Sequence, residues 1–184
     1  MTANPWLVPI TTMRRSIGAR RQEERVGPVG ELRVAESVVP AGAVAKADAI
    51  LDSVDGGIEV SAVVTAPWIG ECRRCLVSVE GELRCEVREV YRPRRTEEGF
   101  DDDDDTYRLQ PDHLDLQPLV RDALLLELPM APLCQEDCLG ICTTCGADRN
   151  TDGCDCSIEV RDPERGASDV LRRHPGDAPR GATT

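Results

Sequence analysis

The sequence predicts an α+β fold: an antiparallel sheet that could close into a barrel, one amphipathic helix and a C-terminal zinc ribbon. Three observations carry this prediction. One segment alternates apolar and charged residues, a later segment repeats apolar residues at helical spacing, and eight of the nine cysteines fall in close groups. With 184 residues, the chain is long enough for one compact domain and a small appendage. It is too short for a large multidomain enzyme.

The composition divides the chain into three parts. Residues 1–130 carry the sheet and helix patterns, and residues 131–160 contain six of the nine cysteines. Residues 161–184 consist mainly of Asp, Arg, Gly, Pro and Ala without apolar periodicity, which is typical of a disordered tail. The acidic block at residues 97–105 repels itself and therefore favours a solvated loop.

Two segments have the pattern of β-strands. Residues 58–64 are rich in β-branched side chains and lie between a Gly-Gly pair and a proline. In residues 77–88 the odd positions are apolar or small and the even ones mostly Glu or Arg, so one face of this strand is predicted to be buried. Cys85 falls on that face and is predicted to be a core residue, not a ligand. Residues 1–56 mix short apolar runs with Gly and Pro, which predicts short strands and loops.

The predicted helix lies between Asp115 and Pro129. Asp115 is the predicted N-cap, Pro118 fits the first turn, and Pro129 ends the helix. Apolar residues recur between them at helical spacing: Leu116, Leu119, Val120, Ala123 and Leu124. We expect this helix to lie across the sheet.

The net charge of the chain restricts its partners. The sequence has 22 Lys and Arg against 34 Asp and Glu, a formal net charge of −12 at pH 7. The field of the whole molecule therefore repels phosphate backbones and anionic lipid, which excludes nonspecific coating of nucleic acid. No apolar run approaches the ~20 residues of a membrane span, and the run near the start is too short for a signal peptide. We expect a cytoplasmic protein that binds no membrane.

The cysteines have the spacing of zinc ligands. Structural zinc takes four thiolate or imidazole ligands, and a two-residue gap lets one turn present two sulfurs to a single ion. Nothing in the sequence suggests export, which favours metal binding over disulfides. Each of four pairs can supply half a site: Cys72 and Cys75, Cys134 and Cys138, Cys142 and Cys145, and Cys154 and Cys156.

One grouping of these pairs requires the least chain strain. It forms a C-terminal zinc ribbon from Cys142, Cys145, Cys154 and Cys156. It leaves a second site, linking the sheet to the end of the helix, for Cys72, Cys75, Cys134 and Cys138. The spacing also allows only the C-terminal group to bind zinc, with the first pair as a free dithiol. Neither of the two histidines falls among the cysteines, so a catalytic zinc with an open position is not predicted.

Arginines form local basic groups in this acidic chain. One group near the start includes Arg14, Arg15, Arg20 and Arg21, and another flanks the first cysteine pair and the long strand at Arg73, Arg74, Arg92, Arg94 and Arg95. If the sheet gathers them on one face, they would form a phosphate-binding patch, because charges beyond about 8 Å are largely screened. A coding bias toward arginine explains the same groups without RNA. The five aromatic residues are too scattered to predict a base-stacking platform.

Several motifs follow one another in a distinctive order. Glu71-Cys72-Arg73-Arg74-Cys75-Leu76 precedes the alternating strand, the helix, and Leu128-Pro129 leading to Pro132-Leu133-Cys134. The spacing Cys134-x3-Cys138-x-Gly140-x-Cys142-x2-Cys145-Gly146 comes next, followed by Cys154-x-Cys156. This order resembles the YceD family of large ribosomal RNA subunit accumulation proteins, in its cysteine-rich branch. The resemblance covers about residues 30–157.

The resemblance implies a bacterial or plastid protein needed for normal accumulation of 23S rRNA, often encoded beside a large-subunit ribosomal protein. We therefore expect a non-enzymatic factor in large-subunit ribosome biogenesis that binds precursor 23S rRNA, a ribosomal protein, or both. The family motif C-x-R-C is carried by Cys72, Arg74 and Cys75, which makes Arg74 the leading functional arginine. Some relatives lack the later cysteines, so the expected one or two zinc ions would support the fold.

A different function also fits the residues. A cysteine beside basic residues has a lowered pKa and is readily oxidised. Cys72, next to Arg73 and Arg74, would then be the sensor of a thiol-based redox or zinc-release switch. The sequence indicates no oligomeric state.

Overall fold

The computed structural model describes residues 4–93, 106–151 and 153–156. The chain divides into two compact units, with the boundary between Gly140 and Ile141. The predicted acidic loop at 97–105 and the predicted tail at 161–184 lie outside the described residues. None of the described helices is both long enough and apolar enough to span a membrane.

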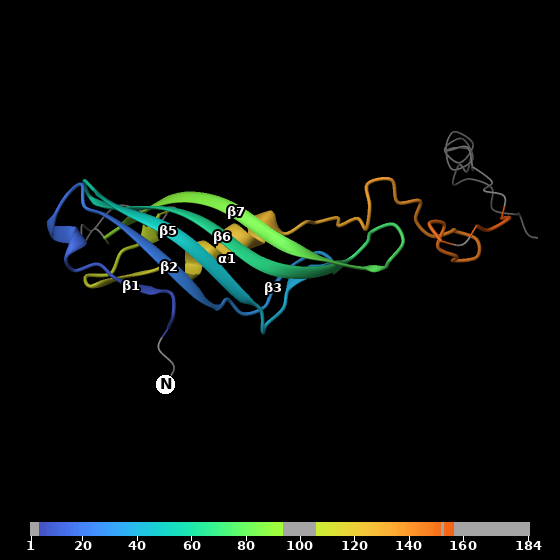
Figure 1. Ribbon diagram of the computed structural model, residues 1–184, viewed down its shortest axis with the longest axis horizontal. Coiled ribbons are helices and arrows are strands. Elements are labelled where there is room, and N and C mark those ends of the chain that lie inside the picture. Colours follow the sequence, from blue (N-terminus) through green and yellow to red (C-terminus); the bar gives the residue numbers. More distant parts are fainter. Residues whose placement is uncertain (1–3, 94–105, 152, 157–184) are drawn as a thin grey trace, which may run out of the picture. The chain divides into compact units, whose positions relative to one another are not determined.

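The first unit is built around one large, mainly antiparallel sheet (Figure 1). Its strands are β2 (Arg20–Pro28), β3 (Leu32–Val34), β4 (Ser37–Val39), β5 (Val44–Val54), β6 (Gly57–Glu71), β7 (Ser78–Arg92) and the short β8 (Tyr107–Arg108). Strand β6 is central and pairs with β7 along nearly its whole length. It also pairs with β5 up to Thr65 and with β4 at Ile69. The prediction of an α+β fold based on an antiparallel sheet is confirmed.

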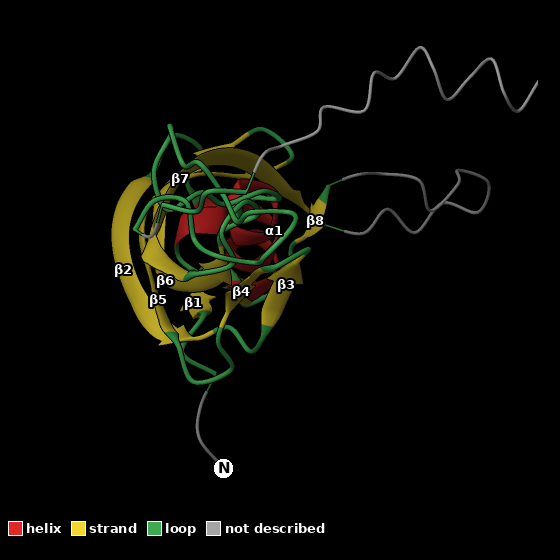
Figure 2. Cartoon of the chain, turned by 90° about the vertical axis from the view of Figure 1, so that its right-hand side faces the viewer, coloured by secondary structure: helices red, strands yellow, loops and turns green. Residues whose placement is uncertain are grey.

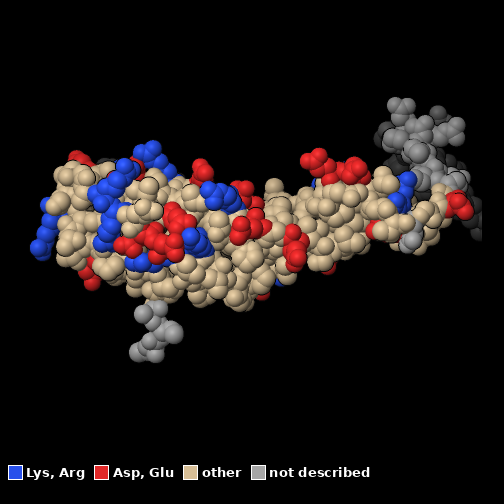
Figure 3. Space-filling model, viewed as in Figure 1, with Lys and Arg blue, Asp and Glu red and all other residues tan. Residues whose placement is uncertain are grey.

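The sheet is open, so the barrel alternative was wrong. Among the described strands, β2 pairs with β5 alone and forms one edge. On the other side of the sheet, β8 pairs only with the last two residues of β7. Five of the nine residues of β2 are charged, and Figure 3 shows acidic and basic side chains intermingled over β2 and β5. Charges on an edge strand discourage pairing with another chain, which makes an open edge tolerable.

Both strands predicted from their patterns are present, and both are longer than predicted. The segment 58–64 lies within β6, which continues through Pro67 to Glu71. Proline is compatible with this position because the stretch between Thr65 and Ile69 is unpaired along one edge of β6. In β7 the predicted apolar face is buried at Leu83 and Cys85, and burial raises the pKa of the Cys85 thiol to about 11. Cys85 is therefore a core residue, as predicted.

In the first 56 residues, strands β3 and β4 are short, as predicted, but β2 and β5 are longer than predicted. Strand β5 has eleven residues, and its alternate side chains from Ala45 to Leu51 are fully buried. Three of these buried residues are alanines, whose low hydrophobicity hides the period-two pattern in the sequence. Small side chains on this face let the sheet lie close to the elements packed against it.

Helix α1 (Gln117–Glu127) packs on β3, β6 and β7, and Figure 2 shows the sheet curving around it. Its buried residues are Leu119, Val120, Ala123 and Leu124, four of the five predicted helical apolar residues. Leu116, not Asp115, occupies the N-cap position, but the Oδ1 atom of Asp115 accepts the N–H of Gln117 at 2.9 Å. The carboxylate therefore performs the predicted capping from one position earlier.

A small two-stranded sheet completes the core of the first unit. Strand β1 (Leu7–Pro9) pairs with β9 (His113–Asp115), and the short 3-10 helix Met13–Arg15 follows β1. Trp6 is 1% exposed, and its Nε1–H donates to the carbonyl of Pro28 at 3.0 Å. The resulting core joins both sheets to α1. The described part of the second unit consists of turns and one isolated bridge between Ile141 and Asp148.

Candidate metal centres

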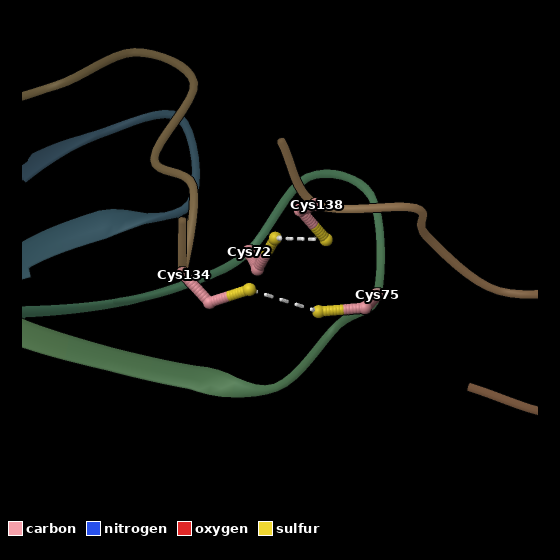
Figure 4. Close-up of side chains that lie close together, drawn as sticks. All are labelled: Cys72, Cys75, Cys134 and Cys138. Carbon is pink, nitrogen blue, oxygen red and sulfur yellow. Dashed lines mark hydrogen bonds between the residues drawn. The ribbon is translucent and has the colours of Figure 1, made fainter. Parts of the chain in front are cut away.

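Four cysteines meet at the end of the β6–β7 hairpin (Figure 4). Cys72 and Cys75 lie in the loop between the two strands, and Cys134 and Cys138 lie in the segment after α1. All four Sγ atoms lie within 4.8 Å of one another, with Cys72 3.8 Å from Cys138 and Cys75 3.5 Å from Cys134. Zinc–thiolate bonds of about 2.3 Å place the sulfurs of a tetrahedron about 3.8 Å apart. The sulfurs are therefore spaced as ligands of one ion.

Backbone hydrogen bonds shape the loop that carries the first two cysteines, residues 72–77, which we call the first knuckle. The N–H of Leu76 donates to the carbonyl of Cys72 at 2.9 Å, and the N–H of Cys72 donates to the carbonyl of Val77 at 2.8 Å. This pattern directs both sulfurs toward the same point. Cys72, Cys75 and Cys138 are buried, and Val79 and Leu133 pack against them as a small separate core.

Two arginines connect the first knuckle to the segment after α1. The backbone N–H of Arg73 donates to the carbonyl of Pro132 at 2.9 Å. The guanidinium of Arg74 donates to the carbonyls of Glu136 and Cys138, at 3.2 and 2.9 Å. Arg74 thus joins the two halves of the cysteine group. Sequence reasoning missed these acceptors because a backbone carbonyl is present at every position, whatever its side chain.

A second group of four cysteines lies in the second unit. The Sγ atoms of Cys142, Cys145, Cys154 and Cys156 also lie within 4.8 Å of one another. The N–H of Gly146 donates to the carbonyl of Cys142, and the N–H of Cys142 to that of Ala147, both at 2.8 Å. Residues 142–147, the second knuckle, therefore repeat the hydrogen bonds of the first. The structure brings together the same two sets of four that required the least chain strain.

Electrostatics in the first group favour one thiolate over several. Burial raises the pKa of the Cys72 thiol, but backbone N–H groups of Cys75, Arg74 and Cys134 lower it to about 6. Burial and the neighbouring sulfurs raise the pKa of Cys134 to about 12. Once one sulfur is charged, its neighbours resist ionisation because like charges within 5 Å repel. A bound cation would offset this repulsion and favour the thiolate form of all four cysteines.

The second group has the same electrostatic asymmetry. Backbone N–H groups of Cys145 and Thr144, with the Cys154 thiol, lower the pKa of Cys142 to about 6. The sulfur of Cys145 and burial raise the pKa of Cys156 to about 12. In both groups the donors are four sulfurs with no histidine. A closed set of four thiolates fits structural zinc, whereas catalytic zinc keeps a position open for water or substrate.

The structure does not bring the predicted RNA-binding arginines onto one face. Arg73 and Arg74 lie in the first knuckle, whereas Arg92 ends β7 at the opposite end of the hairpin, beside the β5–β6 turn. The fifteen residues of β6 separate the two ends by roughly 45 Å. Arg14 lines a cavity of about 190 Å³ at the Arg92 end, together with Ile17, Gly57 and Pro93. Arg94 and Arg95 lie outside the described residues.

Two of the predicted arginines are held by acidic neighbours. Arg20 pairs with Asp52 at 3.1 Å. Arg21 pairs with Glu23 at 2.8 Å and donates to the carbonyl of Pro9 at 2.6 Å. Since Arg21 is in register with the buried Leu51, its side chain lies on the inner face of the sheet. By contrast Arg14, Arg15 and Arg92 are exposed and form no ion pair with a described residue.

Comparison with known proteins adds to this geometry. The model of the family described as "Large ribosomal RNA subunit accumulation protein YceD" matches residues 60–167. Uncharacterized proteins of Mycobacterium tuberculosis and Mycobacterium bovis are each 32% identical over 146 residues, which cover 78% of this chain and 70% of theirs. "Large ribosomal RNA subunit accumulation protein YCED homolog 1, chloroplastic" of Arabidopsis thaliana is 36% identical over 59 residues, 32% of this chain and 18% of that protein. No solved structure matches this chain.

Proposed function

The chain belongs to the family of the large ribosomal RNA subunit accumulation protein YceD, and from this we propose that it is a non-enzymatic factor supporting accumulation of 23S rRNA. The observation that carries the proposal is the family match over residues 60–167, which includes both groups of cysteines. The family name describes a role in accumulation, which a protein can fulfil by binding, without making or breaking bonds. The plant relative carries the same description in its name.

In this proposal each cysteine group holds one zinc ion as a structural element. In the first group, zinc would fasten the segment after α1 to the β6–β7 loop, two regions about sixty residues apart in sequence. Four thiolates leave no coordination position for substrate, so zinc would contribute shape and stability. The spacing of the sulfurs and the repulsion between them that a cation would offset support this assignment.

Precursor 23S rRNA would be contacted at the end of the first unit that carries Arg14, Arg15 and Arg92. These three side chains are exposed and form no ion pair with a described residue. Arg14 donates one hydrogen bond to the carbonyl of Pro111 at 2.9 Å and borders the cavity beside the β5–β6 turn. Planar guanidinium groups bind phosphate with two parallel hydrogen bonds. Because the whole chain carries −12, such contact would be local and would not extend over the surface.

The proposal is tested by depleting the protein from its own cells. Depletion should lower mature 23S rRNA relative to 16S rRNA, and the wild-type gene should restore the ratio. Cys134→Ser, which removes one predicted zinc ligand, should fail to restore it. Cys85→Ala is the matched control, because Cys85 is a core cysteine outside both groups. An unchanged 23S to 16S ratio after depletion would refute the proposal.

The alternative of a redox switch has no comparable support. Its predicted sensor, Cys72, is fully buried at 0% exposure, so peroxide has no direct access to the sulfur. The backbone hydrogen bonds around Cys72 close the loop of the first knuckle, as those around Cys142 close the loop of the second.

A further inference from the structure

The two knuckles have the same backbone hydrogen bonds but different residues at one position. In each, the residue after the second cysteine has a positive φ: +76° at Gly146 and +63° at Leu76. Glycine adopts this left-handed conformation without a steric penalty, whereas a leucine side chain clashes with its own backbone. The first knuckle therefore carries a bulky residue where the second shows that glycine suffices.

Packing within the first unit does not explain this leucine. Leu76 is 59% exposed and the adjacent Val77 is 41% exposed. Leu139, which follows the ligand Cys138, is also exposed at 59%. Gly140 lies directly against the backbone of Arg74, so the 138–140 segment passes close to the knuckle. The described part of the first unit thus ends in exposed apolar side chains beside the cysteine group.

Acidic side chains outnumber basic ones around these apolar side chains by three to two. Glu71, Glu136 and Asp137 are exposed next to the cysteines, against Arg73 and Arg74. The Arg74 guanidinium is already directed at two backbone carbonyls. Zinc held by four thiolates would add a charge of about −2 at the same place.

From this combination we infer that Leu76 and Val77, with the acidic residues Glu71, Glu136 and Asp137, form a docking surface for a basic protein segment that carries an apolar side chain. The inference rests on the proposed function, in which this partner would be a protein of the large ribosomal subunit. Apolar side chains are buried when they dock on another protein, and an acidic rim attracts a basic partner. RNA fits less well, because the three acidic residues outnumber Arg73 and Arg74 there and neither aliphatic side chain offers a ring for base stacking.

Leu76→Gly tests the surface without threatening the fold, because glycine fits a positive φ. The zinc-loaded full-length chain is immobilised and exposed to RNA-free protein extracted from purified large ribosomal subunits, and the retained proteins are identified by mass spectrometry. The affinity of the most enriched protein is then measured in solution. We expect the wild-type chain to retain basic ribosomal proteins, and Leu76→Gly to bind at least tenfold more weakly. Asp137→Lys, which reverses one charge of the rim, should also weaken binding.

Leu126→Ala provides the matched control. Leu126 is 88% exposed on α1, outside the first knuckle and the segment 131–140, and its truncation should leave binding unchanged. The inference is overturned if the wild-type chain retains no ribosomal protein, or if Leu76→Gly retains the same proteins with unchanged affinity. It is equally overturned if Leu76→Gly loses affinity for purified 23S rRNA instead. The ratio of 23S to 16S rRNA after depletion is a separate measurement. An unchanged ratio would refute the proposed function without refuting the docking surface.

Discussion

Arg74 has a defined structural task at the scale of single residues. Its guanidinium donates to the carbonyls of Glu136 and Cys138, so it holds one cysteine-bearing segment against the other. We expect Arg74→Ala to weaken zinc binding at the first group roughly tenfold, the order of effect seen when groups outside the ligand shell are removed. Competition with a chromogenic chelator measures this affinity. Arg73→Ala should bind zinc normally, because Arg73 contributes its backbone N–H, which the substitution keeps. Equal losses in both variants would contradict the role assigned to Arg74.

Leu76 supports a second prediction at the same scale, on stability. A left-handed conformation costs an L-residue roughly 1–2 kcal/mol in the folded protein, and glycine avoids this cost. Glycine also has more conformational entropy in the unfolded chain, which lowers the free energy of unfolding by roughly 0.5–1 kcal/mol. The free energy of unfolding of Leu76→Gly should therefore equal that of the wild type or exceed it by up to about 1.5 kcal/mol. Urea unfolding of the zinc-loaded chain provides the measurement. A clear loss of stability would show that the leucine side chain packs in the folded protein.

At the scale of elements, zinc should stabilise one region of the first unit more than the rest. The cysteine group forms its own small core, separate from the main core between the sheet and α1. Removing zinc with a chelator should therefore release the first knuckle and residues 131–140 while β5 and β6 stay folded. Hydrogen exchange should become at least roughly tenfold faster at the amides of Arg73 and Leu76. Amides at the β5–β6 pairing serve as the internal control, and their simultaneous loss of protection would show one cooperative unit instead.

Zinc affinity should also rise with pH, because the cysteine thiols must lose their protons to bind the ion. Zinc binds thiolates, so each thiol that is still protonated must release its proton on binding. The pKa of Cys72 is lowered to about 6, and that of Cys134 is raised to about 12. Between pH 7 and 9 the Cys72 thiol is mostly ionised and the Cys134 thiol protonated, so zinc affinity should rise about tenfold per pH unit for each thiol that is still protonated. Zinc titrations at several pH values test this, and an affinity independent of pH would contradict ligation by four cysteines.

Elements differ in how far the sequence predicts them, and the reason is physical. The alternation in β7 and the helical repeat in α1 use large apolar residues, so both periodic patterns can be recognised in the sequence. Strand β5 buries mainly alanines, which are too weakly hydrophobic to reveal its two-residue period in the sequence. The structure shows this period as alternating burial. The cysteine pairs can be recognised in the sequence because two ligands lie on one turn. The backbone acceptors of Arg74 cannot, because they depend on how distant segments of the chain meet. Whether the sheet closes depends on its edges, since β2 finds no second partner among the described strands.

At the scale of the whole molecule, the first unit has two chemically different ends. The β6–β7 hairpin keeps the first knuckle, with its apolar and acidic side chains, roughly 45 Å from the end that carries Arg92. Under the proposed function, a strand pair of this length would let one protein meet a basic partner at one end and a phosphate backbone at the other. In that proposal, the overall charge of −12 disfavours RNA contact over the rest of the surface.

The last prediction concerns this arginine end. Replacing Arg14, Arg15 and Arg92 together with glutamine should weaken binding to a 23S rRNA fragment and flatten its salt dependence. Each lost contact with a single-stranded phosphate lowers the slope of log affinity against log salt by about 0.7, so three contacts lower it by about 2. Fluorescence anisotropy at several salt concentrations measures both quantities. Arg20→Gln is the control, because Arg20 is already paired with Asp52 and should contribute little to RNA binding. If the triple variant keeps the wild-type slope while Arg73→Gln loses affinity, then RNA binds at the knuckle, and the assignment of the two ends must be reversed.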